Sequence, residues 1–200
     1  MRLVLQRVKH ASVVSWFTHK TQNKAAIKIG RGYLIYVAVG QEDSEDDVTI
    51  LVDKLAKLRF FPQKDKVRVN HETHDFQKSV IDIKGSILVI PNYTLYGDLN
   101  DGNRPYFGQA AEQEMAARLY ELLLKQLKKT CGKGVTVKTG MFGEFMEVSA
   151  TNDGPATLVL ETGLIDHMEE YVESEQIEED NYAENFDDML DRLGVDLDNI

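Results

Sequence analysis

Hydrophobic and polar residues alternate at the start of the chain, and this pattern predicts a β-strand. Leu3, Leu5 and Arg7 fall on one face of the strand, opposite Val4, Gln6 and Val8. The apolar, β-branched run 33–39 is typical of a buried strand. The same criteria predict further strands at residues 11–15, 24–29, 79–83, 86–90, 135–139, 144–149 and 157–161.

Two other segments have the spacing of amphipathic helices. Ser44 precedes Asp47 in a capping-box-like order, and apolar residues then recur at helical intervals as far as Leu58. A second helix is expected from about 109 to 129, before the glycines at 132 and 134, whereas the polar stretch 62–77 reads as a loop. The expected fold class is α/β, a single sheet-rich domain with a barrel-like sheet covered by two amphipathic helices.

The composition changes abruptly after Gly163. Residues 165–200 contain 14 acidic residues and one basic residue, whereas residues 1–164 carry 22 basic and 19 acidic residues. We therefore expect a domain at 1–163 and an acidic C-terminal tail at 164–200, disordered or weakly helical by default. Within this tail, apolar residues at helical spacing predict a short docking helix at 182–193, which would pack on this chain, on a second copy or on a separate protein partner.

Several classes of protein are disfavoured by the composition. No apolar run reaches the roughly 18 residues of a membrane span, and the N-terminal stretch lacks the apolar core of a signal peptide, so we expect a cytoplasmic protein. Cys131 is the only cysteine, which excludes an internal disulfide and favours a buried, incidental thiol. His71 and His74 stand in a polar loop without further ligands beside them, and no phosphate-binding loop is present. We expect neither a metal nor a cofactor.

A cluster of cations lies at the end of the second expected helix. The helix dipole favours cations at that end whatever the function, and contacts to RNA phosphates are the alternative explanation. Because residues 1–164 are mildly basic, a nucleic-acid partner is compatible with the sequence. The candidates for contact with tRNA are Lys125, Lys128, Lys129 and Lys133.

Two short segments stand out as candidate chemistry. The first, Pro-Asn-Tyr-Thr-Leu-Tyr at 91–96, follows an apolar strand, and the second is Asn-Asp-Gly-Pro-Ala-Thr at 152–157. On composition alone the second segment indicates a plain turn, because proline cannot donate to a sheet ladder. Neither segment by itself identifies a reaction.

Together with other motifs, these segments resemble the D-aminoacyl-tRNA deacylase family in identity and in order, over residues 1 to about 163. The other motifs are the opening MRLVLQRV, Ile-Gly-Arg-Gly at 29–32, Arg-Phe-Phe at 59–61, Gly-Asn-Arg-Pro at 102–105 and Thr-Gly-Met-Phe-Gly at 139–143. Thr94, Leu95, Asn152, Gly154, Pro155 and Thr157 match the family patterns Ser-Gln-Phe-Thr-Leu and Asn-x-Gly-Pro-Val/Phe-Thr. Pro91, Asn92 and Tyr93 depart from the first pattern, and Ala156 departs from the second.

The resemblance implies a homodimer with pockets at the subunit interface. A cis Gly154-Pro155 bond of one subunit would enter the pocket of the other, with Arg7 holding it in place. Fixed backbone carbonyls would accept the ammonium group of the substrate and leave no room for an L side chain, so glycyl-tRNA would be a plausible second substrate.

The reaction implied by the resemblance is hydrolysis of the ester of D-aminoacyl-tRNA. Backbone N–H groups near Tyr93 and Thr94 would stabilise the oxyanion, and the terminal 2′-OH of the RNA would assist. Thr94 is the candidate catalytic side chain, with an orienting role favoured over a nucleophilic one. The expected substrate-binding residues are Arg7, Pro91, Asn92, Tyr93, Leu95, Asn152, Gly154, Pro155, Ala156 and Thr157. The alternatives are a non-catalytic binding protein and a deacylase for another mischarged tRNA.

Overall fold

The computed structural model describes residues 1–16, 26–63, 76–100 and 102–164. Two compact units divide the chain, Met1–Thr162 and Gly163–Ile200. The expected docking helix at 182–193 lies outside the described residues, as do His71 and His74. The elements of the first unit are β1 (Arg2–Trp16), β2 (Ile27–Ile29), β3 (Gly32–Ala38), α1 (Glu45–Lys57), β4 (Ser86–Pro91), the 3₁₀ helix η1 (Tyr93–Tyr96), α2 (Gln113–Cys131), β5 (Thr136–Thr139) and β6 (Phe145–Glu161).

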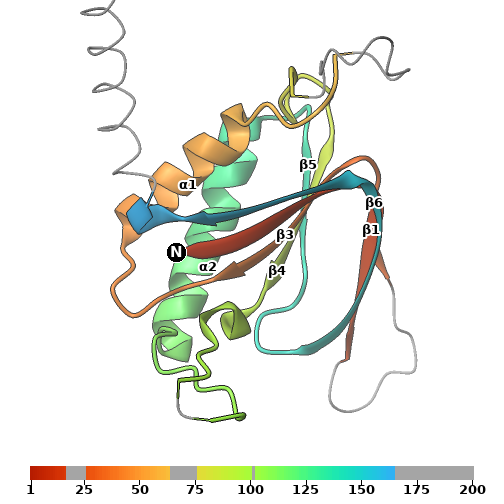
Figure 1. Cartoon of the computed structure of the whole chain (residues 1–200). Coiled ribbons are helices and arrows are strands. Elements are labelled where there is room, and N and C mark those ends of the chain that lie inside the picture. Colours follow the sequence, from red (N-terminus) through yellow and green to blue (C-terminus); the bar gives the residue numbers. More distant parts are fainter. Residues whose placement is uncertain (17–25, 64–75, 101, 165–200) are drawn as a thin grey trace, which may run out of the picture. The chain divides into compact units, whose positions relative to one another are not determined.

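The expected α/β domain with a nearly closed, barrel-like sheet and two main helices is confirmed. The sheet has the order β2-β1-β3-β4-β5, with β6 paired to the other edge of β1. β1 is antiparallel to β2, β3 and β6, whereas β3, β4 and β5 run parallel. At the far side β2 approaches β5, where Lys138 Nζ donates to the carbonyl of Lys28 at 2.6 Å. Figure 1 shows both helices on one side of the sheet.

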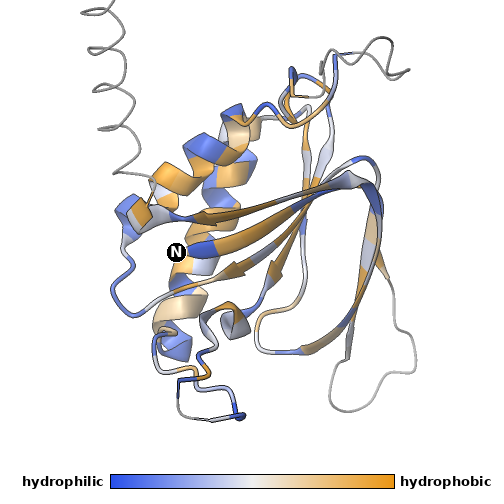
Figure 2. Cartoon of the chain, in the orientation of Figure 1, coloured by the Kyte–Doolittle hydropathy of each residue, from blue (hydrophilic) through white to orange (hydrophobic). Residues whose placement is uncertain are grey.

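The two faces of the central strands bury different side chains, because successive residues of a strand point to opposite faces. Tyr33 and Ile35 face the core beneath the helices, whereas Leu34 joins a second core with Leu88 on the other face. This double burial explains the uninterrupted apolar sequence of β3 and β4. In Figure 2 the hydrophobic colour accordingly follows these strands and one side of each helix.

In two places, two strands that were predicted separately form one continuous strand. Residues 3–8 and 11–15 belong to the continuous β1, and residues 144–149 and 157–161 belong to β6, which follows β1 along most of its length. The pairing of β1 with β6 shifts register on both sides of Val8. Between Gln6 and Val8, the extra residues of β6 form a bulge. The predicted plain turn at Gly154-Pro155 is therefore a bulge within a strand.

Two further predictions require correction. Residues 79–83 form a turn and not a strand, because the Asp82 carboxylate accepts hydrogen bonds from the backbone and hydroxyl of Ser79 at 2.8 and 2.9 Å. Helix α2 begins at Gln113 and not near residue 109, because the backbone just before it pairs with the end of β3. There Ala111 N donates to the carbonyl of Val39 at 2.9 Å.

Candidate functional site

The segment Pro91–Tyr96 continues from the carboxyl end of β4. Asn92 N donates to the carbonyl of Val37 at 2.8 Å, which extends the sheet by one bond before the chain enters η1. Tyr96 is buried, whereas Tyr93 is 61% exposed and packs edge-on against Phe107 with ring centroids 5.2 Å apart. The first N–H groups of a helix have no partner within it. The start of η1 can thus present backbone donors together with an exposed ring.

Thr94 is exposed, and its hydroxyl donates to the side-chain carbonyl of Asn92 at 2.6 Å. An amide oxygen accepts this hydrogen bond but cannot take the proton, so Asn92 does not activate Thr94 as a nucleophile. The contact does fix the orientation of the hydroxyl. It also gives a role to Asn92, one of the departures from the family pattern.

The bulge of β6 carries the second candidate segment, Asn152–Thr157. In the ladder Gln6 pairs with Thr157 and Val8 pairs with Asn152, so four residues of β6 lie opposite Arg7 alone. Gly154 and Pro155 are exposed, and the peptide bond between them is cis, as the resemblance implies. Ala156 packs against the core beneath the helices. The bulge therefore presents backbone groups at the surface.

Arg7 fixes this bulge from below. The side chain is buried with 7% exposure, its Nε donates to the carbonyl of Asp153 at 2.8 Å, and its Nη1 donates to the carbonyl of Phe60 at 2.9 Å. The guanidinium also lies over the rings of Phe60 and Phe76, at 5.8 and 5.9 Å. Arg7 thus holds the residue immediately before Gly154.

Asp153, Phe60 and Phe76 are supporting residues that were not among the sequence candidates. Asp153 and Phe60 accept from Arg7 through their carbonyls, which every residue has, so the sequence gives no signal of these two hydrogen bonds. Their side chains also lie near Arg7, with an Asp153 carboxylate oxygen 3.8 Å from Nε. The motif Arg-Phe-Phe at 59–61 was the available hint.

The two candidate segments occupy different parts of the domain. In Figure 1, η1 lies below the sheet and the bend of β6 lies at the upper right. The structure brings Arg7 to Gly154-Pro155 and Asn92 to Thr94, but it does not bring these two groups together within one chain. Within one chain the two segments therefore lie apart.

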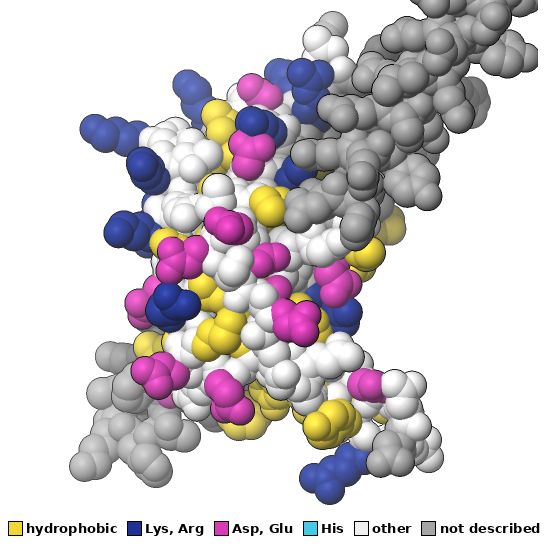
Figure 3. All heavy atoms as spheres, turned by 90° about the vertical axis from the view of Figure 1, so that its left-hand side faces the viewer, with side chains coloured by type: hydrophobic (Ala, Val, Ile, Leu, Met, Phe, Trp, Pro, Cys, Tyr) yellow, Lys and Arg dark blue, Asp and Glu magenta, His cyan; other side chains and the backbone are white. Residues whose placement is uncertain are grey.

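The cations at the end of α2 are exposed as a group at the surface. The turn that follows α2 lies beside the turn before β4, where Thr136 N donates to the carbonyl of Gly85 at 3.2 Å, and Lys84 approaches Gly134. Lys84, which the sequence candidates did not include, is thus an exposed residue beside the turn that carries Lys133. Figure 3 shows Lys and Arg side chains gathered near the top of one face, with Asp and Glu mainly over its middle and lower parts. The exposed candidates are Lys125, Lys128, Lys129 and Lys133.

Other chemistry has little support in the described part of the chain. Cys131 is buried, as expected, and burial raises the pKa of its thiol. Within residues 1–16, 26–63, 76–100 and 102–164, no group of three or more His, Cys, Asp and Glu side chains could hold a metal ion. Among the same residues, no helix has the length and apolar character needed to cross a membrane.

The fold and these segments define a small α/β protein whose candidate site offers backbone groups and a hydroxyl. A family model described as D-Tyr-tRNA(Tyr) deacylase matches residues 4–161. The D-aminoacyl-tRNA deacylase of Bacillus pumilus is 43% identical over 162 residues, which cover 81% of this chain and 99% of that protein. The protein of the same name from Exiguobacterium sibiricum is 40% identical, with 80% and 99% coverage. The chain belongs to the D-aminoacyl-tRNA deacylase family, whose members are ester hydrolases acting on aminoacyl-tRNA.

Two solved structures share the fold of this chain. A structure named c-Myc DNA Unwinding Element Binding Protein is 33% identical with a TM-score of 0.68, covering 80% of this chain and 98% of that one. A second structure, described as a probable eukaryotic D-amino acid tRNA deacylase, has a TM-score of 0.64 over 80% and 97% of the two chains. Its identity of 16% supports the fold alone.

Proposed function

We propose that this protein removes D-amino acids from tRNA and selects them with the Gly154-Pro155 bulge. The observation that carries the proposal is the exposed bulge itself, held through Asp153 by the buried Arg7. Backbone groups fixed in this way keep one position as substrates exchange. A rigid carbonyl can accept the ammonium group of a D-aminoacyl ester while excluding an L side chain. Glycine has no side chain to exclude, so we propose glycyl-tRNA as a second substrate.

The proposed functional unit is a homodimer. Gly154-Pro155 and η1 are apart within one chain, so a second copy would supply the bulge to the η1 of the first. Strand β6 offers a surface for such pairing, because Phe145 and Val159 are exposed large hydrophobic residues of this strand. Among the described strands, β6 pairs with β1 alone, which leaves its other edge available.

The proposed reaction is attack of water on the ester carbonyl, which breaks the bond to the terminal adenosine and releases the D-amino acid and the intact tRNA with a free hydroxyl. The N–H groups at the start of η1 would stabilise the oxyanion, and the 2′-OH of the terminal adenosine would help to activate the water. Thr94 would orient the substrate or water through its fixed hydroxyl. Leu95, Asn152 and Thr157 would line the same site. No metal or cofactor is needed for these steps.

The lysine cluster would bind the tRNA backbone. Phosphate contacts position an RNA without reading its sequence, which suits an enzyme that must accept tRNAs of many kinds. Lys84 would extend this surface beyond the four lysines at the end of α2. Because charged tRNA is used in the cytosol, we place the activity in the cytoplasm. We also propose that the acidic tail binds a protein partner.

One assay tests the function directly. Purified protein is incubated with D-tyrosyl-, L-tyrosyl- and glycyl-tRNA, and the loss of each ester is followed with time. We expect rapid loss of the D ester, loss of the glycyl ester and survival of the L ester. Survival of all three would favour a non-catalytic binding protein. Preferential loss of a different mischarged tRNA would favour a deacylase of altered specificity, as changes in a pocket can produce.

A further inference from the structure

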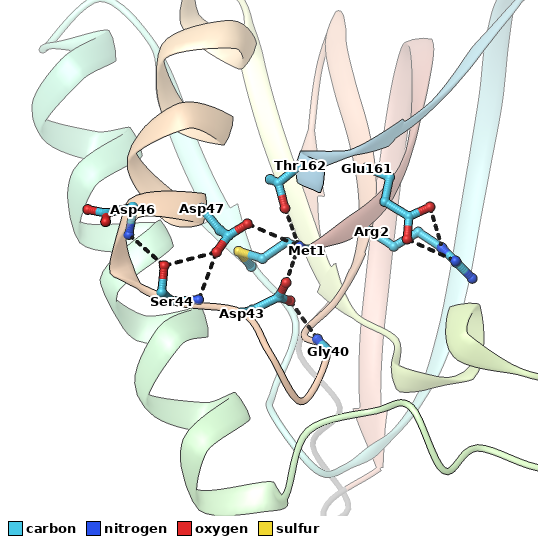
Figure 4. Close-up of polar contacts among 9 residues, drawn as sticks. All are labelled: Met1, Arg2, Gly40, Asp43, Ser44, Asp46, Asp47, Glu161 and Thr162. Atoms are coloured by element: carbon cyan, nitrogen blue, oxygen red, sulfur yellow. Dashed lines mark hydrogen bonds and ion pairs between the residues drawn. The ribbon is translucent and has the colours of Figure 1, made fainter. Parts of the chain in front are cut away.

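Arg2 connects three elements at the edge of the domain. Its Nη1 donates to the carbonyl of Leu95 in η1 at 2.9 Å, while Nε and Nη2 donate to the carboxylate of Glu161 at 3.2 and 2.9 Å. The guanidinium also lies over the ring of Tyr96, 4.7 Å from its centroid. Figure 4 shows Glu161 and Arg2 facing each other, joined by two contacts. Because a guanidinium is a rigid planar fork, these contacts fix its plane.

The position of Arg2 parallels that of Arg7. Both belong to β1, and each donates to a main-chain carbonyl of one candidate segment. Arg7 holds Asp153 beside the bulge, and Arg2 holds Leu95 within η1. Arg2 is also the direct partner of Glu161 in the β1–β6 ladder, so its orientation is set by the sheet. One strand therefore anchors both segments of the proposed site.

We propose that Arg2 is a positioning residue for hydrolysis, with Glu161 as the group that aligns it. By fixing the carbonyl of Leu95, Arg2 fixes the short helix η1, and with it the N–H groups of Tyr93 and Thr94. Arg2 itself touches no substrate. The inference rests on the proposed function of η1. A misplacement of about 1 Å in such donors lowers a rate by up to roughly 10²-fold, so a small relaxation of η1 is enough to impair turnover.

The effect of Arg2 on turnover can be separated from its effect on stability. Arg2 and Glu161 are 29% and 31% exposed, so the pair is partly solvated, and the loss of folding free energy in each variant is measured beside its kcat. The chain offers a matched control in Arg118 and Glu45, an exposed pair at 3.0 Å that joins α2 to the start of α1. Among the described residues, neither member of that pair forms a hydrogen bond or ion pair with η1. Removing Arg118 therefore removes an ion pair of similar N–O distance, although a more exposed one at 65% and 62%, and leaves η1 unchanged.

The test compares Arg2→Met, Arg2→Lys, Glu161→Gln and Arg118→Met in the full chain. For D-tyrosyl-tRNA we expect Arg2→Met to lower kcat about tenfold, with KM within about twofold of the wild type. Arg2→Lys should recover part of kcat, because an ammonium can reach Leu95 or Glu161 but cannot replace the fork. Glu161→Gln should fall between wild type and Arg2→Met. Arg118→Met should match the wild type.

Hydrogen exchange provides a readout that does not depend on catalysis. We expect the amides of residues 93–97 to exchange faster in Arg2→Met but not in Arg118→Met, since only the first variant releases η1. Equal kcat and equal exchange in the two variants would overturn the proposal. If the wild type hydrolyses no aminoacyl-tRNA, the proposed function fails, and unchanged exchange in Arg2→Met would still overturn the positioning role by itself.

Discussion

At the scale of single residues, Gly154 is the position with the strictest chemical requirement. Its φ is +146°, and a Cβ built there would lie 2.5 Å from the backbone nitrogen of Ala156. Any side chain would therefore be strained and would push the bulge out of place. The bulge presents its backbone for recognition, so the lack of a side chain is part of the proposed function as well as of the local fold.

We predict that Gly154→Ala lowers kcat/KM for D-tyrosyl-tRNA by about 10²-fold, because the proposed selecting groups move by a large fraction of an ångström. Ester hydrolysis under single-turnover conditions measures the change. Gly163→Ala is the control, since a Cβ there meets no atom within 4 Å. Full activity in Gly154→Ala would show that the bulge does not take part in substrate selection or catalysis.

Thr94 allows a second prediction at this scale. If its hydroxyl orients the substrate or water, Thr94→Val should lose about tenfold in kcat, and Thr94→Ser should stay close to the wild type. A nucleophilic Thr94 would instead form an acyl-enzyme, and Thr94→Val would then be inactive. Mass spectrometry of the quenched reaction distinguishes the two roles. A covalent adduct at Thr94 would contradict the orienting role.

At the scale of elements, the sequence was informative where one physical signal dominated. The capping box of α1 is present, with the Asp47 carboxylate accepting from Ser44 N at 2.8 Å, and the uninterrupted apolar run of β3 matches its two buried faces. The stretch 79–83 has the apolar pattern of a strand, but local hydrogen bonds between Ser79 and Asp82 outweigh it. The bulge in β6 was also missed, because register depends on the partner strand.

Asp47 joins the start of α1 to the residues at the start of β1 and the end of β6, Met1 and Thr162. Burial raises its pKa, but hydrogen bonds from Thr162 and Ser44 outweigh burial and hold the pKa below the ordinary value of 3.8. Nearby, the ammonium of Met1 lies 2.5 Å from Asp43 and from the Thr162 hydroxyl (Figure 4). Since the folded pKa is lowered, the ionised form of Asp47 stabilises the fold above about pH 4, and this stabilisation is lost as the pH falls through the folded pKa.

We predict that Asp47→Ala lowers the free energy of unfolding at pH 7 by about 1 kcal/mol, the usual effect of losing a helix cap. The difference from the wild type should shrink as the pH falls below about 4, because the wild-type carboxylate is then protonated. Urea unfolding at a series of pH values measures both effects. Asp46→Ala serves as the control, as Asp46 is exposed and takes part in the cap only through its backbone. A difference that is constant with pH would contradict the role of the charge.

At the scale of the whole molecule, the sequence predicted a sheet with two helices on it. The distance between the two candidate segments within one chain could not be predicted from the sequence. Both Thr94 and Gly154 were identifiable from their motifs. Their distance from each other depends on long-range pairing, in which β6 returns along β1 from the other end of the chain. A motif states which residues matter but not whether one chain or two must bring them together. The separation agrees with the homodimer that the family resemblance implies, in which the two segments come from different subunits.

The acidic tail gives the last prediction. The family match ends at residue 161 and the first compact unit ends at Thr162, so a chain ending at Gly163 should stay folded and hydrolyse D-tyrosyl-tRNA with the wild-type kcat. Removing 14 acidic residues should also lower KM at low salt, if the tail competes with tRNA phosphates for the lysines of α2. This advantage should disappear as salt screens both partners. An insoluble or monomeric truncation would instead assign the tail to the core or to the dimer, and a KM equal to that of the full chain at every salt concentration would rule out competition with the RNA.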